Sequence, residues 1–268
     1  MLAFDPRDSA GVEVGRNGVG QAVPPGASRT FTFYAHPDVG ETTALLRDWG
    51  NVLANPSDGL YGAVVVGPRG ATFSDPLTGE DIASRSSWRA DVSVPGAASY
   101  RDFVLLVQDQ DEVIGTAQMP YSEQVQGTAG INHRAEPLAP RLTRNPDTAS
   151  VFASAVHGDP ATPLLEAFAG DALRIHVLAP ASEQAHVFSI EGHRWPFEAG
   201  RGGTPLVSST QVGPLDALTL QLVAGSGGVV SGDYLYGDHR EPYRQAGLWG
   251  LLRVYQPGQG QPLLVPLR

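Results

Sequence analysis

Glycine and proline interrupt this sequence so often that it favours short strands joined by turns. Of its 268 residues, 32 are glycine and 22 are proline, which is a high share for a helical protein and a normal one for an all-β protein. Short runs of β-branched and aromatic residues lie between these turn residues, for example Tyr61 to Val66 and Leu218 to Val223. The second run alternates polar and apolar residues, which is typical of a half-buried strand. The best candidate for a helix is short, Glu41 to Trp49, so we predict an all-β fold.

The charge balance and the missing residue types exclude several kinds of function. Lys and Arg number 18 against 28 Asp and Glu, which gives a net charge of -10. An acidic chain has no basic surface to offer phosphate groups, so we expect no nucleic-acid partner and no anionic membrane partner. The chain has no cysteine, which excludes disulfides, thiolate metal ligands and cysteine nucleophiles. We also expect no membrane segment and no signal peptide in this sequence.

A proline-rich stretch predicts a division into two domains. We interpret residues 136–159 as a linker because Pro137, Pro140 and Pro146 break any long element. The predicted domains are then 1–135 and 160–257, followed by a tail at 258–268. Few residues precede the first histidine-bearing strand at His36, so we expect the first domain to be N-terminally truncated. An incomplete sandwich leaves an unpaired strand edge, which a strand donor or a homo-oligomer would complete.

Both predicted domains end on the same composite pattern. A strand that ends in histidine is followed by a loop and then by a Gly-Leu-aromatic-Gly strand. The first half carries this pattern at His36 and Gly59, and the second half carries it at His239 and Gly247. Two occurrences in matching places indicate internal duplication.

This repeated ending resembles the last strands of the cupredoxin domains in multicopper oxidases. In that family the penultimate strand ends in His-Cys-His, and a loop with a His and a Met or Leu leads into a Gly-Met/Leu-x-Gly strand. An earlier segment of paired histidines corresponds to His186 to His193 here. The stretches Tyr34 to Thr42 and Gly232 to Tyr243 are similar to bacterial multicopper oxidase-like proteins. The resemblance covers nearly the whole chain. It implies two cupredoxin-like Greek-key β-sandwich domains, the first incomplete, and a place outside the cytoplasm.

The resemblance implies copper as the cofactor, although most ligands of the type 1 copper are replaced. That site needs a thiolate, two imidazoles and a weak axial group. His186 occupies the position of the first imidazole. Asp238 replaces the thiolate, Tyr243 the second imidazole and Leu248 the axial residue. One ligand of the set therefore remains.

The oxygen-reducing copper cluster of the family is similarly depleted. Three candidate ligands survive, namely His36, His239 and the substituted carboxylate Glu191. If the two domains face each other as in the oxidases, these residues could converge on a mononuclear N,N,O metal site. Such a set suits Zn, Cu(II) or Fe(II) equally. The alternative is that the three residues are relics, hydrogen-bonded to the backbone or to water.

The remaining titratable residues have simpler interpretations. Asp109, Asp111 and Glu112 follow an apolar run and form either a solvated loop or a hard-cation site such as calcium. We expect His193 to be a turn or core residue and His176 to be an ordinary strand residue.

Two functions from different classes therefore remain open. The first is a multicopper oxidase-like oxidoreductase, although this chain alone could not complete the copper sites. The second is a non-catalytic structural or binding module with a relic or repurposed mononuclear metal site. No residue is assigned a catalytic role.

Overall fold

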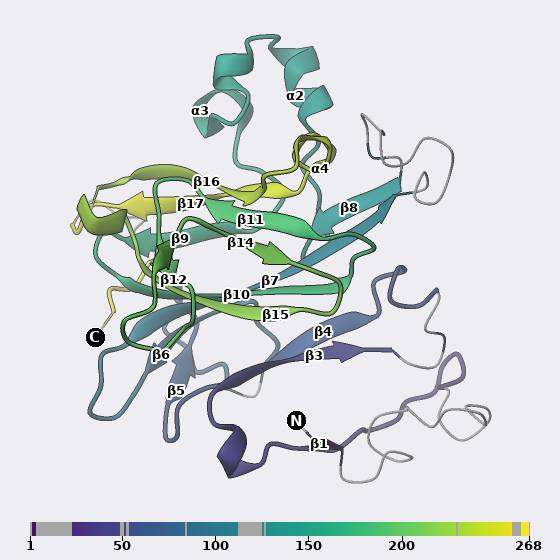
Figure 1. The fold of residues 1–268 in the computed structure, drawn as a ribbon, viewed down its shortest axis with the longest axis vertical. Helices are drawn as coiled ribbons and strands as arrows, with labels where there is room; N and C mark the ends of the chain where they lie inside the picture. Colours follow the sequence, from purple (N-terminus) through teal and green to yellow (C-terminus); the bar gives the residue numbers. More distant parts are fainter. Residues whose placement is uncertain are drawn as a thin grey trace. The chain divides into compact units, whose positions relative to one another are not determined.

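The computed structural model describes residues 2–3, 23–48, 51, 54–83, 85–111, 125, 127–228, 230–258 and 264–267. The chain divides into two compact units, Met1–Pro68 and Arg69–Arg268. Among the described residues of both units, strand residues outnumber helical ones (Figure 1). The predicted all-β class is therefore confirmed.

The first unit contains two antiparallel strand pairs. Its elements are β1 (Leu2–Ala3), β2 (Phe33–Tyr34), the 3-10 helix η1 (Pro37–Val39), β3 (Thr42–Arg47) and β4 (Tyr61–Val66). β1 pairs with β2, and β3 pairs with β4 so that Thr42 lies opposite Val66. The best candidate for a helix, Glu41 to Trp49, contains β3 instead. Pairing with the valines of β4 prevails over a weak helical pattern in a segment that begins with two β-branched threonines.

The second unit is a sandwich of two larger sheets, with an additional two-stranded ribbon. In the first sheet the strand order is β15-β10-β7-β6-β5, and β8 also pairs with β7. Its strands are β5 (Thr72–Ser74), β6 (Arg89–Ser93), β7 (Tyr100–Asp111), β8 (Gly127–Ile131), β10 (Ala172–Ala181) and β15 (Ala217–Val223). In the second sheet the order is β14-β11-β16-β17-β9. Its strands are β9 (Leu164–Phe168), β11 (His186–Ile190), β14 (Ser209–Val212), β16 (Gly232–Asp238) and β17 (Trp249–Tyr255). The ribbon consists of β12 (Trp195–Pro196) and β13 (Leu206–Val207).

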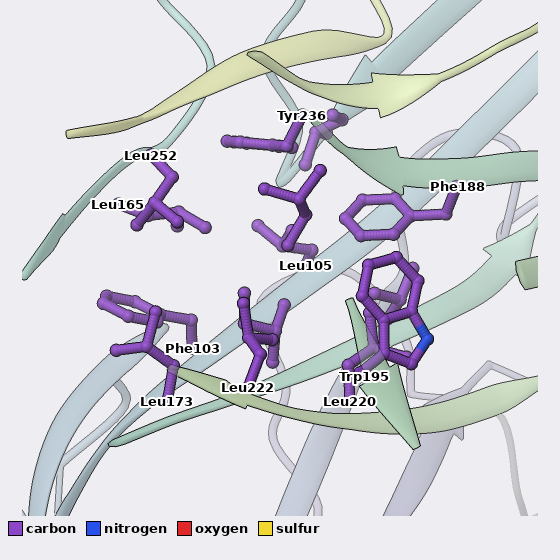
Figure 2. Close-up of a cluster of buried hydrophobic side chains, with 14 of the residues drawn as sticks. Phe103, Leu105, Leu165, Leu173, Phe188, Trp195, Leu220, Leu222, Tyr236 and Leu252 are labelled. Carbon is purple, nitrogen blue, oxygen red and sulfur yellow. The ribbon is translucent and has the colours of Figure 1, made fainter. Parts of the chain in front are cut away.

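The hydrophobic core lies between the two sheets of the second unit. Phe103 and Leu105 of β7 lie in one buried cluster with Phe188 of β11 and Leu252 of β17 (Figure 2). Alternate residues of each strand enter the core because successive side chains of a strand point to opposite faces. Full burial of each such side chain contributes about 1.5–3 kcal/mol.

Two parallel strand pairs join distant segments of the chain within this sandwich. β7 runs parallel to β10, with Phe103 opposite Ile175, and β9 runs parallel to β17. Because β7 is a direct neighbour of β10, the strands at 72–131 share a sheet with strands of the segment 160–257. The observed division at Pro68 thus differs from the boundary expected at 136–159.

The described helices of the second unit are short. They are α2 (Leu138–Arg144), η2 (Thr148–Ser150), α3 (Ser154–His157), η3 (Ser226–Gly228) and α4 (Glu241–Ala246). The first three lie in the segment expected to be a linker, and α2 and α3 lie above the second sheet in the view of Figure 1. None of the helices in the described part of the chain is long and apolar enough to cross a membrane.

Candidate functional site

The structure brings together the four residues that correspond to type 1 copper ligands. His186 begins β11 and Asp238 ends the neighbouring strand β16, and their side chains meet with Nδ1 of His186 2.7 Å from Oδ2 of Asp238. The ring of Tyr243, on α4, stands edge-on to the imidazole at 5.0 Å between centroids. All three side chains and Leu248 are buried. A cavity of about 10 Å³ borders His186, Asp238 and Leu248, which is room for about one water molecule.

A carboxylate from the opposite sheet completes this cluster. Oδ2 of Asp109 forms an ion pair with Nε2 of His186, and the Asp109 side chain is fully buried. Oδ1 of the same residue accepts a hydrogen bond of 2.6 Å from the backbone N–H of Glu183. The interpretation of Asp109 as part of a solvated loop is wrong, because β7 continues to Asp111 by pairing with β8. The side chains of Asp111 and Glu112 lie outside the described residues. We call His186, Asp109 and Asp238 the buried triad.

The second carboxylate of the buried triad is held by the backbone. Oδ1 of Asp238 accepts hydrogen bonds of 3.0 Å from the N–H groups of Val187 and Arg240. The guanidinium of Arg244 donates from Nε to the carbonyl of Asp238 at 3.0 Å. Gly247 ends α4 with φ 118° and packs so closely that a Cβ there would lie 2.6 Å from the backbone nitrogen of Glu136. These contacts fix both the carboxylate and the short helix that carries Tyr243.

Both ring nitrogens of His186 face carboxylate oxygens, an arrangement that favours the charged imidazole, which donates from both nitrogens. Burial lowers the pKa of His186, but the hydrogen bonds and the charges of Asp109 and Asp238 outweigh it and raise this pKa to about 9. An imidazolium has no free lone pair for a metal. The chain also has no thiolate, and the set holds a single imidazole. These residues therefore do not fit a type 1 copper ion.

A second group of predicted residues lies on the outward face of the same sheet. Ser189 of β11 pairs with Gly237 of β16, and Glu191 and His239 follow these two strands directly. Nε2 of His239 lies 3.5 Å from Oε1 of Glu191, and both side chains are about half exposed. They border an open cavity of about 550 Å³ that Ser209 and Arg194 also line. We call this the outer pocket.

His36, the third predicted ligand, belongs to the first unit. It is the N-cap of η1, where its Nδ1 accepts a hydrogen bond of 3.2 Å from the N–H of Asp38. The side chain is 45% exposed and its ring lies 5.7 Å from that of Tyr34. The structure thus pairs Glu191 with His239, and a shared site with His36 stays a prediction. The described residues contain no cluster of three or more His, Cys, Asp or Glu arranged to hold a metal ion.

Two further histidines are fully engaged in the fold. Nδ1 of His193 lies 2.9 Å from the carbonyl of Glu191, and Nε2 accepts from the N–H of Gly225 at 3.1 Å. This pattern fixes a neutral ring, and burial lowers the pKa of His193. His176 lies on β10, where its ring contacts Thr219 at 2.9 Å and Oδ1 of Asp102 at 2.8 Å.

Comparison with protein-family models gives no match. Among curated proteins, a segment of 85 residues is 29% identical to the "Probable nitrite reductase-hydroxylamine oxidoreductase fusion protein" of Kuenenia stuttgartiensis. This segment is 32% of the present chain and 9% of that protein. The chain therefore spans only a small part of this curated relative.

Several solved structures are similar to this chain at low sequence identity. Copper nitrite reductase from Nitrosomonas europaea has a TM-score of 0.47 and 17% identity, over 85% of this chain and 68% of its own. Blue copper oxidase from the same organism has a TM-score of 0.49 and 15% identity, over 91% and 67%. Laccase from Botrytis aclada has a TM-score of 0.46 and 15% identity, over 85% and 37%.

Sequence reasoning missed Asp109 as a partner of His186, although a signal was present. Phe103, Leu105, Val107 and Asp109 follow one another at intervals of two residues. If the strand continues past Val107, the side chain of Asp109 therefore points to the same interior face. Arg101 has the same parity and is also fully buried. A charged residue in phase with core residues therefore indicates a buried ion pair.

Proposed function

We propose that this chain is a multicopper oxidase-like cupredoxin module that performs no oxidase chemistry by itself and serves as a structural or binding module. The buried triad carries this proposal, because an imidazolium between two carboxylates occupies the position where electrons would enter through copper. Copper binding and oxidoreductase activity are the alternative that follows from resemblance. That alternative needs a thiolate and histidine pairs from another chain or segment.

The first test is copper titration of the whole chain. We expect no intense thiolate-to-copper absorption and no oxidase turnover after addition of Cu(II), because the ring nitrogens of His186 already hold protons. Nitrogen NMR of the imidazole should show both ring nitrogens protonated at neutral pH, with or without copper. An intense blue band, or a copper-induced change at His186, would contradict the proposal.

A gain-of-site variant makes the test sharper. The double substitution Asp238→Cys with Tyr243→His supplies the missing thiolate and the second imidazole beside His186. We expect this variant to become blue with Cu(II), measured by visible absorption and electron paramagnetic resonance. The matched control, Asp238→Ser with Tyr243→His, has the same geometry without the thiolate and should stay pale. A folded cysteine variant that binds no copper would show that these positions do not correspond to a copper site.

A metal at the outer pocket is a second candidate function, because Glu191 and His239 present a carboxylate and an imidazole to solvent 3.5 Å apart. If His36 contributes to the same site, replacing both histidines by alanine should abolish stoichiometric zinc or copper. The measurement is metal analysis after dialysis. His133→Asn is the control, since His133 is exposed and has φ 62°, a conformation that asparagine also adopts. Unchanged metal content in the double variant would remove this candidate.

The place of action and the assembly are also part of the proposal. A location outside the cytoplasm rests on the resemblance to multicopper oxidases. The expectation that a strand donor or a second copy completes the predicted first domain, 1–135, stays a prediction.

A further inference from the structure

A fully buried arginine joins four separate parts of the second unit. Nη1 of Arg101 on β7 donates to both carboxylate oxygens of Asp91 on β6, at 2.7 and 2.9 Å. Nε donates at 2.6 Å to Asp171 in the turn between β9 and β10. Nη2 donates at 2.6 Å to the backbone carbonyl of Val265. The guanidinium therefore binds two carboxylates from the sandwich and one carbonyl from a segment far along the chain.

That segment, residues 264–267, lies outside every strand and helix, and we call it the strap. The N–H of Val265 donates to the carbonyl of Pro76 at 2.8 Å, while its own carbonyl accepts from Arg101. Leu264 is only 4% exposed. Val265 is thus held through both its N–H and its carbonyl group. The side chain of Leu264, the residue before it, is buried and serves as an apolar anchor.

The place that receives the strap is built independently of it. Pro76 belongs to a tight turn in which Oδ1 of Asp75 accepts from the N–H groups of Leu77 and Thr78, at 2.7 and 3.2 Å. Arg101 is fixed by Asp91 and Asp171. A carbonyl acceptor and a guanidinium donor therefore remain in place for one residue of an extended peptide. We call this place the seat.

Two observations indicate that the strap can leave the seat while the sandwich stays folded. Among the described residues, two hydrogen bonds and one buried leucine attach it to the sandwich, and the chain forms a turn at Pro257 and Gly258. Segments with few buried contacts open at much lower free energy than core strands. Opening would leave a buried N–H of Arg101 without its carbonyl partner, which favours occupation of the seat by another peptide backbone.

We propose that the strap is a latch that opens locally, and that its seat is a binding site for an extended peptide segment. In such a segment one residue forms both backbone hydrogen bonds with the seat, and the residue before it is apolar. The occupant in this chain is its own strap, in cis. This proposal does not depend on copper or on the buried triad.

The absence of cysteine in the chain allows a direct test by thiol labelling. Three single variants of the full chain are compared. Leu264→Cys reports the anchor, Pro266→Cys reports an exposed position in the same strap, and Ala167→Cys reports the core. We expect the thiol at 264 to react at least ~10-fold more slowly than that at 266, with a rate that changes little with urea below the unfolding transition. The thiol at 167 should react only as the sandwich unfolds.

Two results would overturn the latch. If the thiol at 264 reacts as fast as that at 266, the strap is not docked. If it follows the urea dependence of the thiol at 167, the strap is an integral part of the sandwich. Hydrogen exchange on the unsubstituted chain gives the same comparison without a variant, because the amide of Val265 should open at lower free energy than that of Ile175.

Binding of a peptide at the seat is tested by a separate measurement. A synthetic peptide of residues 262–268 should increase the labelling rate of Leu264→Cys at least ~2-fold by occupying the vacant seat. The same peptide with Val265→Pro lacks the N–H that donates to Pro76 and should have no effect. Equal effects of the two peptides, or no effect of either, would show that the seat is not an exchangeable site. Labelling that slows with increasing protein concentration would show that a second copy supplies the strap, which contradicts occupation in cis.

Discussion

The variant Asp109→Ala should lose about 3 kcal/mol of its free energy of unfolding, because removal of this carboxylate leaves the buried Nε2–H of the His186 imidazolium without its acceptor. Asp109 lies within the core and contacts His186 from the opposite sheet. Its loss also leaves the N–H of Glu183 without the acceptor of its 2.6 Å hydrogen bond. The measurement is urea unfolding at neutral pH, followed by tryptophan fluorescence.

A surface ion pair provides the control for this experiment. Nη1 of Arg201 lies 2.6 Å from Oε2 of Glu198, but both side chains are exposed. Exposed pairs contribute at most about 1 kcal/mol, so Glu198→Ala should have a small effect. If Asp109→Ala costs no more than Glu198→Ala, the buried triad does not contribute as described.

The second large effect is a loss of stability on the alkaline side. The pKa of His186 is raised to about 9 from its ordinary value of 6.5. Below pH 6.5 the imidazole is protonated in both the folded and the unfolded chain, so the triad contributes in full. Between pH 6.5 and 9 the unfolded chain loses this proton while the folded chain retains it. The free energy of unfolding should therefore fall by about 3 kcal/mol across this interval and level off above it.

The pH dependence can be assigned to His186 with one variant. His186→Gln removes the titrating group, so its stability should vary much less between pH 6.5 and 9 than that of the unsubstituted chain. The measurement is a series of urea unfolding curves at fixed ionic strength. Parallel pH profiles for the two proteins would mean that another group causes the loss.

Sequence patterns predicted much of the second unit because its strands carry local signals. The alternation in Leu218 to Val223 corresponds to β15, and Tyr61 to Val66 of the first unit corresponds to β4. The motif comparison also grouped His186, Asp238, Tyr243 and Leu248 correctly in space. Asp238, Tyr243 and Leu248 follow one another closely along the chain, and His186 joins them because β11 pairs with β16.

The parts that sequence reasoning missed depend on contacts between distant segments. Glu41 to Trp49 carries a weak helical pattern, but pairing with β4 makes Thr42–Arg47 a strand. The spacing of Asp109 and Arg101 with core residues indicates that they are buried, but their partners lie in other segments and cannot be identified from that spacing. The charged state of His186 likewise requires knowledge that two carboxylates approach it from two different sheets.

The two parallel strand pairs have a consequence for how the second unit reaches its fold. β7 meets β10 only after the chain has passed through β8, three short helices and β9, and β9 meets β17 only near the end of the sequence. Closing such long loops costs chain entropy before any compensating contact forms. Folding dominated by these distant pairings is slow, and a growing chain on the ribosome cannot complete the sandwich until β17 has emerged.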